Sequence, residues 1–335
     1  MICLQFLINV CSNLKFNLSS RKIFFLISIF IVIGFSIISN PIRTGDGYEY
    51  SLITKAFVNH QSPNVTSEDI NDRIKDIKTY PNSGYSIEYF EAIKKGIESN
   101  KSSFNSPYTS FFLSKDGHYY GYHFWFYSLI VAIIEIILNI FHLNPLIAFQ
   151  LTNGLFLLLG IFIILNNERN FAIYKSILFL TGGILYYWKW THPEVMIYTC
   201  IFLYYYFLVR NSYKESILFI AIASTQVISL SLLYLFIPLW IYVNQRNKFW
   251  KNFLELLRDF KIWILGLLSL SSLIFYYLNY NKFSLIGDDY SSLSNINTLH
   301  FISYWFDLDQ GVWVGAPWIL VALLFHNYKS KSSNI

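Results

Sequence analysis

Long apolar runs constrain this chain more than any other feature of its sequence. The runs are about 17 to 28 residues long, and roughly 20 helical residues at about 1.5 Å each span a hydrocarbon core about 30 Å thick. Only 13% of the 335 residues are charged, whereas a soluble domain carries about 25%. We therefore expect an integral membrane protein whose main solvent is lipid.

The runs predict a single polytopic membrane domain over residues 1–335, with about eight spanning helices. The expected fold class is an all-α transmembrane helical bundle. Because the connections between residues 124 and 209 are very short, a kinked or half-crossing helix in that region would change the count. The expected spans are 23–39, 124–141, 145–165, 171–188, 195–209, 216–243, 262–280 and 312–326.

Basic residues beside the runs predict the orientation of the chain. Arg21 and Lys22 precede the first run, which places the N-terminus in the cytoplasm, and an even number of crossings returns the basic stretch 246–261 to the same side. The net charge of +5 is then explained by basic residues that orient the chain in the membrane, so we expect no nucleic-acid partner.

The expected external loop, residues 41–121, is polar and contains ten of the twenty acidic residues. Two stretches within it place apolar residues at helical spacing, the first beginning at Ser67 as a helix cap. Both predict short amphipathic juxtamembrane helices that lie on the membrane surface or on top of other helices. Their apolar positions are Ile70, Ile74 and Ile77, then Ile87, Phe90, Ile93 and Ile97.

Asp46 stands where the first run ends, between Gly45 and Gly47 and shortly before Glu49 and Tyr50. Flanking glycines allow a tight turn and the close approach of a ligand, and a carboxylate at the rim of a low-dielectric region is well placed to act as a base. An ordinary interfacial turn with a helix cap explains these residues equally well.

Two further polar segments interrupt the apolar pattern. The loop returns to the membrane through a glycine- and tyrosine-rich segment with His118 and His123, where an aromatic belt explains the tyrosines but not two histidines. A second polar cluster, residues 189–194, lies between two apolar runs. Ionisable residues at membrane depth usually mark a site, although a surface loop would make this cluster unremarkable. Asp307 and Asp309 lack a third ligand, so no metal site and no cofactor are predicted.

The order of these pieces resembles the C-type (GT-C) membrane glycosyltransferases, which include protein O-mannosyltransferases and lipid A aminoarabinose transferases. Two departures from the family pattern are Gly47, where many members have glutamate, and His123, where lysine is frequent. The residues that carry the resemblance are Asp46 and Tyr50, then Gly117, Tyr119, Tyr120 and His123, then Glu194, and finally Gly311 to Pro317.

The resemblance implies an inverting transferase of the bacterial inner membrane. It would move a sugar from a polyprenyl-phosphate donor to a hydroxyl of a glycan, lipid or protein acceptor on the external side, with Asp46 as the catalytic base. The residues expected near the donor phosphate are Arg43, His123, Lys189 and His192. Those expected near the substrates are Glu49, Tyr50, His118, Tyr120 and Glu194.

Alternative functions stay open at the level of sequence. A transporter or lipid flippase would also need aromatic belts and buried polar residues. A surface-polysaccharide polymerase would share the polytopic form and a large external loop. A membrane protein without catalysis is the third alternative. The resemblance also requires Glu194 on the side of the external loop, whereas eight full crossings place it opposite. We therefore expect that one run between residues 124 and 209 does not fully cross.

Overall fold

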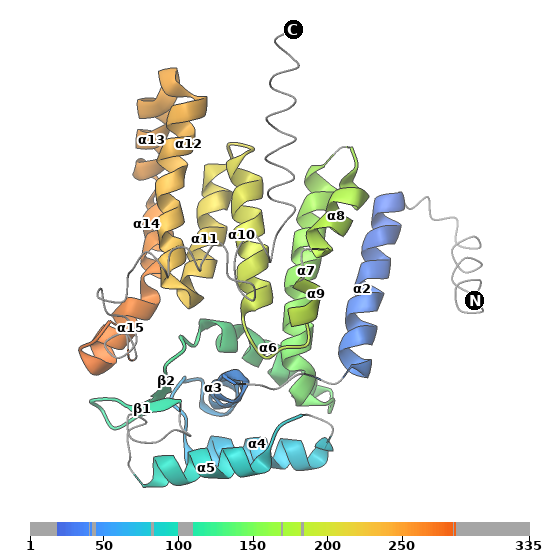
Figure 1. Ribbon diagram of the computed structural model, residues 1–335, viewed down its shortest axis with the longest axis vertical. Coiled ribbons are helices and arrows are strands. Elements are labelled where there is room, and N and C mark those ends of the chain that lie inside the picture. The colour runs from blue at the N-terminus through green and yellow to red at the C-terminus, as the bar shows by residue number, and fades with distance from the viewer. Residues whose placement is uncertain are drawn as a thin grey trace, which may run out of the picture. The chain divides into compact units, whose positions relative to one another are not determined.

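The computed structural model describes residues 19–39, 41, 45–81, 84–99, 110–168, 170–181, 184–283 and 285. The chain divides into a compact unit of residues 1–283 and a second unit of residues 284–335, and every described helix and strand belongs to the first. Within the described residues the chain forms fourteen α-helices and one two-stranded sheet (Figure 1). The predicted helical class is thus confirmed, with a small hairpin added. The predicted span 312–326 lies outside the described residues.

Two helices are long and apolar enough to cross a membrane. They are α2 (Ser20–Ile38) and the continuous segment Pro145–Asn167, formed by η3 (Pro145–Ile147) and α7 (Ala148–Asn167). Two further pairs of helices would raise the number to four if each pair formed one span. The helices Ile228–Asn244 and Arg246–Arg258 meet at a bend of 113°, and the helices Phe260–Ser269 and Ser271–Tyr280 meet at a bend of 52°. A bundle of eight spans therefore stays a prediction.

The remaining predicted spans correspond to shorter or divided helices. The run 216–243 is divided at Val227, after which the backbone follows a 3₁₀ path over η4 (Ile228–Leu235), unusually long for this helix type. The run 171–188 becomes two short helices. The bounds are α6 (Phe126–Ile140), α8 (Ala172–Leu180), α9 (Ile184–Tyr187), α10 (Glu194–Leu208), α11 (Tyr213–Gln226), α12 (Phe236–Asn244), η5 (Arg246–Lys248), α13 (Phe249–Arg258), α14 (Phe260–Ser269) and α15 (Ser271–Tyr280).

The loop after α2 folds into three helices and a hairpin. Helices α4 (Ser67–Thr79) and α5 (Ile87–Glu98) confirm the two predicted amphipathic helices. The cap of α4 is Thr66, not Ser67, because Thr66 and Asp69 exchange the two hydrogen bonds of a capping box. Helix α3 (Gly47–His60) was not predicted. The hairpin pairs β1 (Phe111–Leu113) with β2 (Tyr119–Gly121) in antiparallel register.

The apolar faces of α4 and α5 pack on α3, so these helices lie on another helix and do not present those faces to lipid. Figure 1 shows α4 and α5 side by side below α3. The shared core joins Leu52, Ile53 and Ala56 of α3 to the predicted apolar positions Ile70, Ile74 and Ile77 of α4 and Phe90, Ile93 and Ile97 of α5, all of them buried.

A buried charge network ties α6 to this insert. Arg73 of α4 donates to Glu135 of α6 at 2.8 Å, and both side chains are almost fully buried. Lys55 of α3 pairs with Asp76 at 2.8 Å and lies 3.7 Å from Glu135. Because a buried charge is costly without its partner, α6 is held along α3 and α4.

Candidate active site

Three segments that are distant in sequence converge at the N-terminus of α3. They are the turn at Asp46, the pair Tyr122 and His123 after β2, and residues 188–194 before α10. Figure 1 helps to locate them where α3, β2 and the start of α10 approach one another. This convergence brings together six predicted site residues: Asp46, Glu49, Tyr50, His123, His192 and Glu194.

Asp46 occupies the N-cap position of α3 but does not cap the helix with its side chain. The turn before it places Gly45 at φ +53°, a conformation that glycine adopts without strain. The Asp46 carboxylate instead accepts a hydrogen bond from the Tyr122 hydroxyl at 2.9 Å and lies 3.5 Å from His123 Nε2. Its side chain is 40% exposed, so it is held in place and still accessible.

His123 lies between two carboxylates. Glu49 accepts from the His123 backbone N–H at 2.8 Å and contacts the ring Nδ1 at 3.0 Å, with its own side chain fully buried. Gly121 permits this approach, because a Cβ there would lie 2.2 Å from Glu49 Oε1. Burial lowers the pKa of His123, but the charge of Glu49 and its hydrogen bond outweigh that effect and raise the pKa above 6.5.

Burial likewise raises the pKa of Glu49, against the opposing effect of His123. Glu49 was predicted to contact substrate. The structure places it behind His123, where it orients the imidazole.

Asn153 of α7 positions the segment before α10. Its side-chain amide donates to the carbonyls of Trp188 and Trp190 at 3.1 and 2.9 Å, and it accepts from the Tyr127 hydroxyl at 2.7 Å. The segment then passes so close to α3 that a Cβ on Gly47 would lie 2.0 Å from Thr191 Oγ1. Gly47 is therefore required for this contact.

The Tyr50 ring lies near the rings of both histidines of the cluster. It lies 5.0 Å from the His123 ring and 5.8 Å from the His192 ring, between centroids. His192 Nδ1 lies 3.7 Å from the Glu194 carboxylate, and the charge of Glu194 contributes to the raised pKa of His123. Glu194 thus belongs to the same electrostatic cluster as Asp46.

Three buried polar atoms of residues 190–194 have no hydrogen-bond partner among the described residues. They are Trp190 Nε1, Thr191 Oγ1 and Glu194 Oε2. Buried donors and acceptors are normally satisfied, and leaving one unpaired costs about 1–3 kcal/mol. Two donors and an acceptor of this segment are thus left without partners among the described residues.

One ligand atom each from Asp46, Glu49 and His123 lies within 4.8 Å of the others, so this trio could hold a metal ion. A histidine and two carboxylates suit a small divalent cation. No metal ligands were predicted from the sequence, in which His123 lies 74 positions from Glu49.

The other predicted site residues lie apart from this cluster or outside the described part of the chain. Arg43 belongs to the latter group. Lys189 lies 5.0 Å above the Phe35 ring of α2. His118 and Tyr120 are in the hairpin region, where Tyr120 packs on α15 at 5.1 Å from the ring of Phe275. Sequence reasoning missed the contributions of Tyr122, Trp190 and Thr191, since only their spatial neighbours distinguish them from other interfacial residues.

No protein-family model, curated protein or solved structure matches the chain significantly.

Proposed function

We propose that this protein is an inverting membrane glycosyltransferase that moves a sugar from a polyprenyl-phosphate donor to an acceptor hydroxyl. The convergence of Asp46, His123 and residues 190–194, with unpaired buried polar atoms beside an accessible carboxylate, is the observation that supports it. The resemblance of the motif order to GT-C enzymes supplies the donor class.

In the proposed reaction Asp46 accepts the proton of the acceptor hydroxyl. The acceptor oxygen forms a bond to the anomeric carbon from the face opposite the phosphate, and the bond from that carbon to the phosphate oxygen breaks. The electron pair leaves with polyprenyl phosphate, and the anomeric configuration inverts. Phosphate is a good leaving group without protonation, so one base and local positive charge suffice.

His123 supplies positive charge in this proposal. Its raised pKa extends the imidazolium form to higher pH than is usual for a histidine, and its Nε2 faces Asp46 at the accessible side of the cluster. Glu49 holds the ring from behind. His192 is the second imidazole of the cluster, beside Glu194. Donor phosphate would then lie at the membrane rim, between these groups and the end of α2.

We further propose that α6 is the run that does not fully cross the bilayer. It bonds to α3 near its start, where Ser128 Oγ donates to the Tyr50 carbonyl at 3.2 Å, and to α4 further along through Glu135 and Arg73. A helix held along the insert in this way leaves Glu194 on the side of Asp46. The basic stretch 246–261 then returns to the cytoplasmic side if the run 216–243, which is divided at Val227, also does not cross. The site would then face the external side of a bacterial inner membrane.

The test compares Asp46→Asn with Asp116→Asn, a matched change at an exposed residue of the hairpin turn. Membranes that contain each variant receive polyprenyl phosphates that carry radiolabelled hexose or pentose, and loss of label from the lipid fraction is measured. Asp46→Asn should slow transfer by roughly 100-fold or more, as expected for a general base, while Asp116→Asn should retain the parental rate. Transfer at the parental rate by folded Asp46→Asn would refute the role of Asp46. Failure of the parental protein to use any donor would refute the function.

A further inference from the structure

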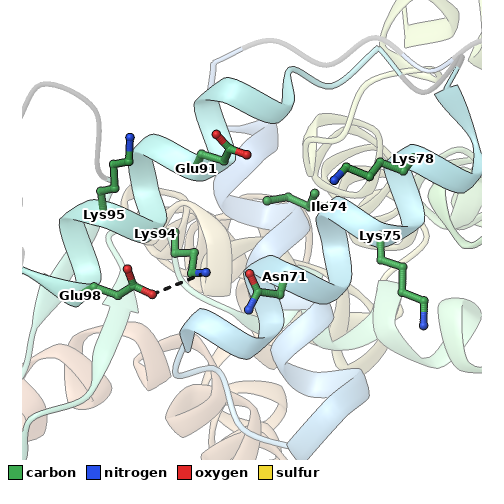
Figure 2. Close-up of a pocket in the computed structure, with 8 residues that line it drawn as sticks. All are labelled: Asn71, Ile74, Lys75, Lys78, Glu91, Lys94, Lys95 and Glu98. Atoms are coloured by element: carbon green, nitrogen blue, oxygen red, sulfur yellow. Dashed lines mark ion pairs between the residues drawn. The ribbon is translucent and has the colours of Figure 1, made fainter.

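A groove of about 490 Å³ lies between α4 and α5, apart from the candidate active site. Figure 2 shows its lining side chains arranged around Ile74, with lysines from both helices. The four lysines are Lys75 and Lys78 from α4 and Lys94 and Lys95 from α5. The groove also contains Asn71, Glu91 and Glu98. Its charged groups sum to a net +2, from four lysines and two glutamates.

Helix α4 separates its charges by face. Asp69, Arg73 and Asp76 share one face and are engaged by α3, through Asn59, the Ser51 carbonyl and Lys55 respectively. Asn71, Lys75 and Lys78 share a second face, offset by two residues and thus by about 200° around the helix axis. Asp76 is therefore paired with Lys55 and Asp69 is hydrogen-bonded by Asn59 on the side of α3, while the lysines line the groove.

The groove carboxylates offset only part of this positive charge. Glu98 lies 3.6 Å from Lys94, an i,i+4 pair shown by the dashed line in Figure 2. Exposed pairs of this kind contribute little to stability, so an incoming anion can replace Glu98 at little cost. Lys75, Lys78 and Lys95 offer further ammonium groups to negative groups spaced along a chain.

The groove does not fit a bilayer surface. Binding of an amphipathic helix to lipid requires a free apolar face, and the apolar faces of α4 and α5 are already buried in the core with α3. Ile74 is the one apolar residue of the groove lining. The groove thus lacks the apolar anchor that strengthens binding to lipid, and its spaced lysines suit the spaced charges of a soluble polyanion.

The N-terminal end of α5 leads from the groove to Asp46. The Ser86 backbone N–H donates to the Tyr48 hydroxyl at 3.0 Å, and the rings of Tyr48 and Tyr89 lie 4.3 Å apart. Tyr48 is two residues from Asp46. Lys95 is nine residues along the chain from Ser86, a distance of about 14 Å by helical rise, which a few sugar units would span.

We propose that this groove binds an anionic glycan, which serves as the acceptor of the transfer; its role as acceptor rests on the proposed function, whereas the binding itself does not. Ammonium groups from two helices would contact uronate or phosphate groups of the glycan, and the chain would extend along α5 toward Asp46.

The test measures binding directly, without a sugar donor. The full chain in neutral phosphatidylcholine nanodiscs is titrated against fluorescein-labelled oligogalacturonate, with neutral maltodextrin of matched length as the control ligand. The change of all four lysines to alanine should weaken oligogalacturonate binding at least tenfold. A matched removal of four charges outside the groove, by alanine at Lys248, Lys251, Lys261 and Lys282, should have no effect. Glu91→Gln with Glu98→Gln should strengthen binding, because two competing carboxylates are lost.

Several outcomes would overturn the inference. Equal affinity for oligogalacturonate and maltodextrin would show that charge is not recognised, and unchanged affinity after loss of the four lysines would place binding elsewhere. If the lysines were required for binding to vesicles of phosphatidylglycerol and phosphatidylcholine but not to oligogalacturonate, the groove would be a lipid headgroup site. Because binding is measured without a donor, the two proposals fail separately: binding without any sugar transfer would refute the catalytic proposal alone, whereas transfer without binding in the groove would refute this one.

Discussion

Glu49 binds His123 twice, through the backbone N–H at 2.8 Å and the ring Nδ1 at 3.0 Å, and its side chain is fully buried. The second ring nitrogen, Nε2, lies 3.5 Å from the accessible carboxylate of Asp46. One carboxylate thus orients the imidazole from the protein interior while the other meets it at the surface of the site. The protonation of His123 therefore depends on both carboxylates as well as on its own burial.

Glu49→Gln should lower the pKa of His123, because the largest effect that raises this pKa is the charge of Glu49. The amide keeps the size of the side chain, so the fold should persist. The His123 ring resonances in a pH titration by NMR measure the shift directly. Glu68→Gln, at an exposed position of α4, is the control and should leave the titration unchanged. An unchanged His123 pKa in Glu49→Gln would contradict the electrostatic account.

Stability should fall as the pH rises from below 6.5 through the higher folded pKa of His123. The pKa of His123 is above 6.5 in the folded protein, so the folded state holds this proton more tightly than the unfolded state. The resulting stabilisation is complete below 6.5 and is lost as the pH passes through the higher folded pKa. Burial raises the pKa of Glu49 too, which has the same sign. The thermal midpoint measured across this range should decline less steeply in His123→Gln, and an equal slope would argue against the linkage.

Gly47→Ala should displace residues 190–194 from α3. The new Cβ would lie 2.0 Å from Thr191 Oγ1, and overpacking of this kind costs about 1–3 kcal/mol. Thr191→Gly removes the obstructing side chain, so the double variant should recover part of the lost stability and sugar transfer. Chemical denaturation and the transfer assay measure the two effects. Additive losses in the double variant would show that the two residues do not meet.

Arg73→Met should destabilise the protein by about 3–5 kcal/mol, because it leaves Glu135 buried without its closest partner. Arg73→Met with Glu135→Leu removes both charges and should recover much of that loss. Free energies of unfolding in mixed detergent micelles give the comparison, with Lys94→Met as a control at an exposed ion pair. If the double variant were less stable than Arg73→Met alone, the coupling between α4 and α6 would not be that of a buried ion pair.

Local patterns in the sequence were sufficient to predict the long apolar helices and the helices that bury one face. Lipid and protein interiors both exclude charge, so long apolar segments such as α2 and α7 are visible from composition alone. The isoleucines of α4 and α5 repeat at helical spacing because one face of each helix packs on α3. These features depend on residues that are near one another in the chain.

Helix α3 was invisible to the same reasoning because it is buried among polar as well as apolar partners. Thr54 bonds to the Tyr50 carbonyl, Lys55 to Asp76, and Glu49 to His123. Polar residues interrupt its apolar positions, and the partners of Lys55 and Glu49 come from α4 and from the segment after β2. A periodic pattern shows which face of a helix is buried, but it does not identify individual pairs of polar residues.

The residue types of the candidate site followed from sequence, and their assembly followed from tertiary structure. Asp46, His123 and Glu194 were each singled out as ionisable groups beside apolar runs, where charge is costly and usually has a purpose. Their proximity depends on close packing at Gly47 and Gly121 and on the Asn153 hydrogen bonds that hold residues 188–190. Sequence composition thus indicated a membrane environment and located the apolar segments of this protein. Only the fold determined which distant polar groups meet, because hydrogen bonds and steric fit act across space and not along the chain.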